Sequence, residues 1–446
     1  MPMDAGLAVR RVKETRLSLT GFGGKAQSFF GRKFKMNENM LMQYARLVAG
    51  VGIHVQKGQT VVVRCPVDCA AFGRMLNKAC FELGAKDVVM EWRDDFCNRE
   101  HYLHADDSVF DAVYSWNVQK NTELGKMGAG FITVSASDPE NLRGVDPDRL
   151  RRWKEADGRD LKDFYRDMFA NGFPWCVVSV PVLSWAKKVF PNDTDDAAME
   201  KLWDAIFAAV RVREDGDAVQ AWREHCAYLD EYAAKLNTLK LTQLRYRNAL
   251  GTDVTVGMPK EHLWLAGADT AKSGVRFVAN MPTEEIFSAP QRDAVDGVLC
   301  ASKPLTLDGN LIEGIRLTLE HGRIVGIHAD KGEEVLRQAI ESDEGAHYLG
   351  EIALVPVNSP IAQSGLLYYN TLFDENAACH FAFGQAYPAC VPGGDDLSEE
   401  ELLACGINAS SSEHVDFMVG TEDLSIIGTT SDGREVVIFK DGRFAL

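Results

Sequence analysis

The chain has 446 residues, which is too long for one ordinary hydrophobic core and favours two domains. Hydrophobic residues at 46% and charged residues at 25% are typical of a globular protein and exclude a disordered or fibrous one. The net charge of −17 argues against nucleic acid as a partner, and the lack of any run of about 18 apolar residues argues against a membrane span.

The first 35 residues are basic and rich in Gly and Ser, unlike the sequence that follows. They contain no apolar stretch followed by a small-residue cleavage site, which argues against a secretory signal. We interpret residues 1–35 as a flexible basic extension, with a transit peptide as the alternative. Ten cysteines without a repeated spacing favour reduced thiols and therefore a cytoplasmic location.

Helical and strand patterns alternate through residues 36–238. The pattern predicts helices over residues 39–51, 70–83, 106–116 and 147–171, and strands over residues 60–64, 87–92, 131–135 and 176–182. Alternation at this spacing predicts a first, α/β domain with a mostly parallel sheet. No G-x-G-x-x-G or Walker sequence follows the first strand, so nucleotide binding has little support.

A long helical stretch over residues 195–237 is expected to end the first domain. After it the pattern changes to short strands over residues 241–256 and 312–328. Two Asp-Gly turns, at Asp432 and Asp441, lie between short β runs and predict hairpins. Residues 239–446 are therefore predicted to form a second, α+β domain with antiparallel sheet.

Three residues of the second domain have the chemistry of metal ligands on predicted strands. Glu351 opens an apolar run to Val357, and a carboxylate beside a core is costly unless it is paired or binds a metal. His414 and Asp416 are two apart on a strand, so they share one face and suit a first-row divalent ion. For each, an ordinary solvent-facing position is the alternative.

Residues 373–387 are predicted to form a helix that begins at Asp374 or Asn376. His380 and Tyr387 are seven apart and would share one face of that helix. The alternative is a hydrogen-bonded core histidine and an ordinary packed tyrosine.

Two adjacent acids, Glu284 and Glu285, follow a proline and precede an apolar pair. Adjacent acids usually lie on one solvated face, but one of them could turn inward and bridge two ions. Together with the strand residues, they supply enough carboxylates and imidazoles for two divalent ions.

The motifs H-E-x-x-H and G-x-S-x-G do not occur. Instead, four segments resemble the thermophilic-type aminopeptidases: NMPTEEIFSAP at residues 280–290, LGEIALVPVNSP at 349–360, YNTLFDENAACHFAFGQAY at 369–387 and HVDFMVG at 414–420. Residues 44–94 also look like the first domain of that family. The resemblance covers nearly everything after Met36.

The resemblance implies a set of metal ligands: Glu285, Glu351, His380, His414 and Asp416. Glu285 is preferred to Glu284 because its separation from Glu351 suits the family pattern. The resemblance also implies that Tyr387 lies close to the metals and that Glu375 is a further acid of the site.

The function that the resemblance implies is a metal-dependent aminopeptidase acting on short peptides. It would use two divalent ions (zinc, cobalt or manganese) that activate water, and it would form a homodimer. Glu351 or Glu375 would act as general base and then acid, and Tyr387 would donate a hydrogen bond to the oxyanion. The alternatives are another metal-dependent dipeptidase or amidase, or an inactive relative that serves as a binding module.

Overall fold

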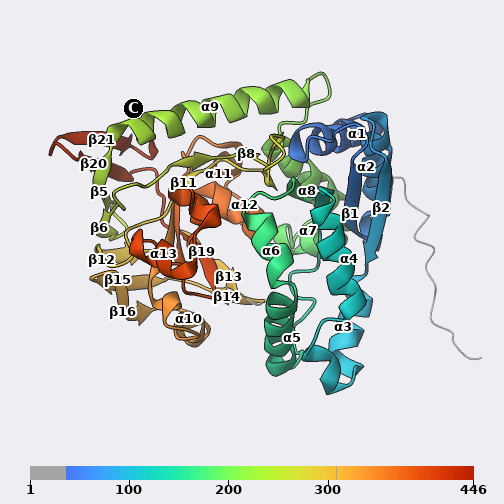
Figure 1. The fold of residues 1–446 in the computed structure, drawn as a ribbon, viewed down its shortest axis with the longest axis horizontal. Helices are drawn as coiled ribbons and strands as arrows, with labels where there is room; N and C mark the ends of the chain where they lie inside the picture. The colour runs from blue at the N-terminus through green and yellow to red at the C-terminus, as the bar shows by residue number, and fades with distance from the viewer. Residues whose placement is uncertain (1–36, 308) are drawn as a thin grey trace, which may run out of the picture. The chain divides into compact units, whose positions relative to one another are not determined.

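The computed structural model describes residues 37–307 and 309–446, and residues 37–446 form one compact unit (Figure 1). The extension predicted over residues 1–35 lies outside the described residues. Two kinds of sheet organise the described chain: a parallel sheet built mainly by its first half, and antiparallel sheets built by its second. This confirms the predicted fold class of an α/β part followed by an α+β part.

The parallel sheet has five strands in the order β10-β4-β3-β1-β2. These strands are β1 (Thr60–Pro66), β2 (Asp87–Arg93), β3 (Gly130–Ser135), β4 (Trp175–Ser179) and β10 (Asn280–Met281). Its inner strand β1 is a β-branched run in which Val61, Val62 and Val63 are fully buried, as a sheet covered on both faces requires. Strand β10 comes from beyond residue 238, so a segment of the second half completes this sheet. The domain boundary after residue 238 stays a prediction.

Helices of the first half lie beside this sheet: α2 contacts β1 and β2, and α1 packs against α2 in turn (Figure 1). They are α1 (Glu38–Leu47), α2 (Ala70–Glu82), α3 (Asp95–His104), α4 (Ser115–Lys126), α5 (Pro147–Asp160), α6 (Lys162–Phe169), α7 (Leu183–Val189), α8 (Asp195–Ala209) and α9 (Ala218–Leu239). The helix predicted over residues 195–237 is divided into α8 and α9. Arg211 adopts a left-handed conformation between them (φ 57°), and the Asp217 side chain caps the start of α9.

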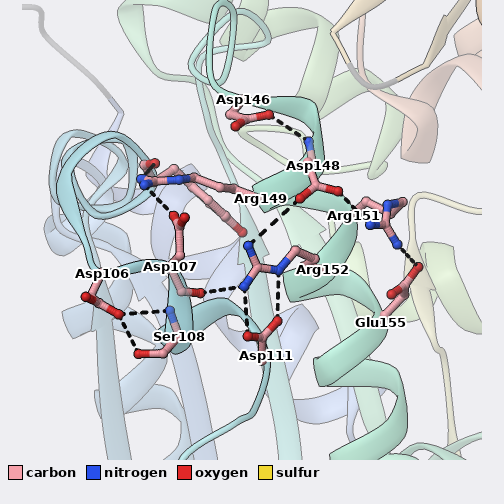
Figure 2. A network of polar contacts seen from close by, with 11 residues as sticks. Asp106, Asp107, Ser108, Asp111, Asp146, Asp148, Arg149, Arg151, Arg152 and Glu155 are labelled. Carbon is pink, nitrogen blue, oxygen red and sulfur yellow. Dashed lines mark hydrogen bonds and ion pairs between the residues drawn. The ribbon is translucent and has the colours of Figure 1, made fainter.

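The prediction of a helix over residues 106–116 is wrong. A short 3-10 turn and a bend occupy this stretch before α4 begins. Figure 2 shows the cause: Arg149 of α5 pairs with Asp107 at 2.6 Å, and Arg152 contacts both carboxylate oxygens of Asp111 at 2.8 Å. These ion pairs fix the turn through residues some forty positions away, which a local helical pattern does not reveal.

An eight-stranded antiparallel sheet organises much of the second half, in the order β16-β15-β12-β6-β5-β20-β21-β22. Its strands are β5 (Leu241–Arg247), β6 (Asp253–Gly257), β12 (Val295–Cys300), β15 (Arg316–Glu320), β16 (Arg323–His328), β20 (Ser425–Thr430), β21 (Glu435–Lys440) and β22 (Arg443–Phe444). The turns at Asp432 and Asp441 join β20 to β21 and β21 to β22, so both predicted hairpins are confirmed.

A second antiparallel sheet has five strands in the order β19-β18-β17-β11-β7. They are β7 (Leu265–Ala266), β11 (Ile286–Ser288), β17 (Leu349–Leu354), β18 (His380–Gly384) and β19 (His414–Met418). Two small sheets join β8 (Asp269–Thr270) to β9 (Arg276–Phe277) and β13 (Leu305–Leu307) to β14 (Asn310–Ile312). The remaining helices are α10 (Glu333–Ile340), α11 (Pro360–Ser364), α12 (Thr371–Asp374) and α13 (Glu399–Ala404).

The single helix predicted over residues 373–387 is wrong. The chain forms the end of α12, a 3-10 turn (Glu375–Ala377) and then β18. Every residue of β18 is buried between β17 and β19, and a fully buried run of this length has no polar face that would separate strand from helix by periodicity.

Apolar side chains of both antiparallel sheets form one core together with α9 and α10. Trp264, Phe381 and Phe417 are among its fully buried members. Helix α9, the long yellow-green helix of Figure 1, contacts α1 and also β7 and β11. Within the described chain, no helix has both the length and the apolar composition of a membrane span. All ten cysteines are free.

Candidate metal centre

Three adjacent strands of the five-stranded antiparallel sheet, β17, β18 and β19, carry most of the site on one face. Glu351 of β17 and Asp416 of β19 both pair with Ala382 of β18, so the two carboxylates flank a small side chain. His380 is two residues from Ala382, and His414 is two residues from Asp416. Strand side chains alternate in direction, so these four polar groups emerge together.

The distances define two groups of possible ligands that share one carboxylate. Nε2 of His380 lies 3.2 Å from Oε2 of Glu285 and 3.9 Å from Oε1 of Glu351. Nε2 of His414 lies 3.1 Å from Oε2 of Glu351 and 3.5 Å from Oδ1 of Asp416. Each group of three offers ligand atoms within 4.8 Å of one another, and Glu351 belongs to both. The structure therefore brings together all five residues that the resemblance implied as ligands.

Backbone carbonyls orient both imidazoles. Nδ1 of His380 lies 3.1 Å from the carbonyl of Ala378, and Nδ1 of His414 lies 2.7 Å from the carbonyl of Gln385. A carbonyl can only accept, so in each ring Nδ1–H donates, and Nε2 is the nitrogen that can bind a cation once it has lost its proton. The two rings are thus oriented with Nε2 toward the carboxylates, as a metal ligand requires.

The electrostatics fit a cation at this point. Oδ1 of Asp416 is buried and meets no hydrogen-bond donor at bonding geometry among the described residues. Burial raises the pKa of Glu351, and its hydrogen bond with His414 only partly opposes this. Burial lowers the pKa of His380, but its hydrogen bond with Glu285 and the neighbouring carboxylates outweigh burial and raise that pKa to about 10. Buried oxygen and imidazole donors of this kind suit a first-row divalent ion.

Metal binding is expected to release protons and to weaken as the pH falls. The pKa of His380 is raised to about 10. The pKa of His414 is raised well above its ordinary value, because Tyr387 and the nearby carboxylates together overcome the effect of burial. Both rings are therefore protonated at neutral pH in the ion-free chain, and each ion must displace a proton. Affinity should then fall about tenfold per pH unit for each proton displaced.

Isothermal titration calorimetry in buffers of different ionisation enthalpy would count these protons. The expected result is about one proton per ion, with one proton fewer in His380→Ala. Release of no protons by the native chain would contradict the assignment of the imidazoles as ligands.

A cavity opens over the centre. It is lined by all five candidate ligands and by Glu375 and Tyr387, and its volume is about 140 Å³. A single water needs roughly 10–15 Å³ by the same kind of measure, so part of a substrate fits as well as solvent. The Tyr387 ring lies 5.0 Å from the His414 ring, which puts the phenol beside the centre as the resemblance implied.

Several lining residues were not anticipated from the sequence. Phe169 and Trp175 come from the first half of the chain, and Asp269 comes from β8. Burial and the nearby charge of Asp395 raise the pKa of Asp269 to about 6. No local sequence pattern distinguishes these residues, because they reach the cavity only through the way the two halves pack.

The two adjacent acids take opposite directions. Glu285 faces the centre, whereas the carboxylate of Glu284 is buried against Arg211, with two oxygen–nitrogen distances of 2.8 and 2.9 Å. The structure therefore agrees with the choice of Glu285 over Glu284 as the group that approaches His380.

The fold and this centre define a metal-dependent enzyme. Carboxylates and imidazoles that suit a first-row divalent ion line a cavity large enough for part of a substrate. The chain belongs to the thermophilic metalloprotease (M29) family, whose model matches residues 37–444. It is therefore a metallopeptidase, and the predicted family is confirmed.

Named relatives align with this chain over almost its whole length. Aminopeptidase AmpS of Bacillus subtilis (strain 168) is 45% identical over 405 residues, which are 91% of this chain and 98% of that protein. Aminopeptidase PepS of Streptococcus thermophilus is 42% identical over 93% of this chain and 99% of that protein. Among solved structures, wild-type AmpT from Thermus thermophilus superimposes with a TM-score of 0.85 at 37% identity, covering 92% of this chain and all of that one.

Proposed function

We propose that this chain is an aminopeptidase that releases N-terminal residues from short peptides with the help of two divalent ions. The observation that carries the proposal is the pair of ligand groups sharing Glu351. The relatives named aminopeptidase support the choice of peptide N-termini over other amides.

The ligand groups suggest how the ions are divided. Glu285 and His380 would hold one ion and His414 and Asp416 the other, with Glu351 available to both as the carboxylate common to the two groups. Ions bound there supply Lewis acidity, which polarises the scissile carbonyl and acidifies water. Zinc, cobalt and manganese all suit this mixture of imidazole and carboxylate ligands.

Glu375 acts as the general base and then the general acid. It lines the cavity but belongs to neither ligand group, so its carboxylate is free to move a proton, whereas Glu351 is engaged by both groups. Burial, together with the charges of Asp416 and Glu285, raises the pKa of Glu375 well above its ordinary value. An acid with a raised pKa can take a proton from water and return it to the leaving amine near neutral pH.

Tyr387 donates a hydrogen bond to the tetrahedral oxyanion. Burial raises the pKa of its phenol, and the neighbouring carboxylates add to this, so the hydroxyl stays protonated and able to donate. Its ring packs against Phe287 and His414, at 5.6 and 5.0 Å between centroids, which limits its movement.

The cavity favours a cationic N-terminus. No lysine or arginine is among the described residues that line it, whereas Asp269 and Glu375 are carboxylates outside the ligand groups. One of them can pair with the free α-ammonium group of a peptide. The cytoplasmic location and the homodimer are further parts of the proposal, and they rest on the free thiols and the family resemblance.

An assay of peptide anilides tests the function. Leu- and Arg-anilides should be hydrolysed, their N-acetylated forms should resist, and a chelator should remove the activity until zinc, cobalt or manganese is added back. Equal hydrolysis of acetylated substrates would favour the dipeptidase or amidase alternative. A reconstituted protein that contains no metal would favour the binding-module alternative.

A further inference from the structure

A buried charged cluster lies directly behind the metal centre. The Glu284 carboxylate accepts a hydrogen bond from Nη2 of Arg211 at 2.9 Å, and its other oxygen forms a close ion pair with Nη1 at 2.8 Å. His225 completes the cluster: its Nε2 lies 3.6 Å from Oε2 of Glu284, and its Nδ1 lies 3.1 Å from Nη2 of Arg211. Glu284 is 3% exposed and the Arg211 side chain 17%, so the pair is largely removed from water.

Stability alone does not explain such a pair. Taking two charges out of water costs several kcal/mol, and an apolar pair of the same volume is often as stable or more so. The best-supported use of a buried ion pair is to specify one geometry. The geometry specified here is that of the chain segment next to Glu285.

Arg211 is itself held rigidly. It lies in the turn between α8 and α9 with a left-handed backbone, its Nη1 donates to the carbonyl of Ala209 at 3.1 Å, and its guanidinium lies 5.5 Å from the Trp222 ring centre. A side chain fixed at this many points can fix its partner in turn. Glu284 is therefore attached to a rigid part of the fold.

The segment before Glu285 is held at two further points. The carbonyl of Thr283 lies 2.8 Å from Nε2 of His225, and the backbone N–H of Glu284 donates to Oδ1 of Asn376 at 2.7 Å. Asn376 stands next to Glu375, and its side chain also donates to the carbonyl of Leu372 at 3.0 Å. This amide thus joins the segment of a metal ligand to the segment of the catalytic acid.

The segment after Glu285 is held by the sheet. Ile286 opens β11 and pairs with Leu354 of β17, the strand that also carries Glu351. Only Glu285 lies between this pairing and the buried cluster, and its carboxylate approaches Nε2 of His380. Its direction is therefore set from both sides.

We propose that Arg211 is a positioning residue of the metal centre: through its buried pair with Glu284 it aims the Glu285 carboxylate at the ion shared with His380. The inference rests on the proposed function. Removal of partners that orient a ligand typically lowers metal affinity by about 10–100-fold. The loss should fall on the ion held by Glu285 and His380 and should spare the ion held by His414 and Asp416.

The test is a double substitution, Arg211→Met with Glu284→Leu, which replaces the charges by apolar groups of similar size. Stepwise metal titration by chelator competition should show one ion bound about 10–100-fold more weakly and the other unchanged. Thermal unfolding of the ion-free protein should stay close to that of the native chain. Excess metal should restore much of the lost kcat, which a merely structural defect would not allow.

The matched control uses another ion pair of the chain. Arg64 and Glu91 pair at 3.1 Å in the parallel sheet, with side chains 14% and 19% exposed. Arg64→Met with Glu91→Leu should leave both metal affinities unchanged. Arg211→Lys retains the charge but replaces the two nitrogens that face Glu284 by one, so it should weaken the same single ion. This variant decides the question if the double variant does not fold.

Unchanged binding of both ions by a folded Arg211 variant would overturn the inference, as would equal weakening of both. A native chain that binds no ions, or that has no aminopeptidase activity, would instead overturn the proposed function, whatever the variants do.

Discussion

Replacing Glu351 with Gln is expected to remove tight binding of both ions and to lower kcat/KM by on the order of 10³-fold or more, equivalent to about 4 kcal/mol. Its two oxygens approach different imidazoles, Oε1 toward His380 at 3.9 Å and Oε2 toward His414 at 3.1 Å. The amide keeps the shape of the side chain but supplies neither the charge nor two acceptor oxygens. One substitution should therefore affect both ligand groups.

Metal content of the reconstituted protein distinguishes this shared role from an ordinary ligand role. His380→Ala and His414→Ala should each lose one ion and keep the other, whereas Glu351→Gln should lose both. Glu435→Gln, at an exposed strand carboxylate, is the control and should keep both ions and full activity. If Glu351→Gln retained one ion at native affinity, the shared carboxylate would be ruled out.

Elements that depend on local pattern could be predicted from the sequence. The β-branched run at Val61 predicted a strand, and the Asp-Gly pairs at Asp432 and Asp441 predicted hairpins, because each signal lies within a few residues of the structure it specifies. The class of the fold followed from local signals of this kind, through the alternation of helical and strand patterns in the first half and the short strands of the second.

The segment around His380 shows where such reasoning fails. Residues 377–384 are apolar apart from His380, so periodicity could not separate helix from strand. The strand is imposed by pairing with β17 and β19 on both sides. The helical interpretation nevertheless put His380 and Tyr387 near each other. The two residues meet at one cavity for a different reason, the register of the sheet.

The choice between Glu284 and Glu285 could not be made from their own surroundings in the sequence. The difference is made by Arg211, 73 residues earlier, which pairs with Glu284 and leaves Glu285 to the centre. Phe169 and Trp175 likewise reach the cavity through tertiary packing. The family resemblance supplied what physical reasoning on one sequence lacked, namely which distant residues converge.

Replacing Glu375 with Gln is expected to lower kcat by about 10²–10⁴-fold while both ions remain bound, because the group moves a proton and does not hold a metal. Retention of both ions separates this variant from Glu351→Gln. Asp374→Asn is the matched control. Asp374 is the adjacent buried acid, but it accepts backbone N–H groups of Tyr368 and Asn370 at 2.7 and 3.0 Å and does not line the cavity, so its loss should reduce thermal stability and leave kcat within a few-fold.

The pH profile of the same variants gives a second and independent readout. Glu375 must be deprotonated to accept a proton from water, and burial raises its pKa, so activity should be lost as the pH falls through that raised value. Bound cations favour the charged carboxylate and therefore lower the pKa of Glu375 again. The acidic limb of the pH–activity profile should thus lie at lower pH in the metal-loaded enzyme than the effect of burial alone would place it. Glu375→Gln should lose this limb in kcat at saturating metal and keep only a flat residual rate. An unaltered acidic limb in Glu375→Gln would assign the proton transfer to another group of the cavity, with Glu351 the first to be considered.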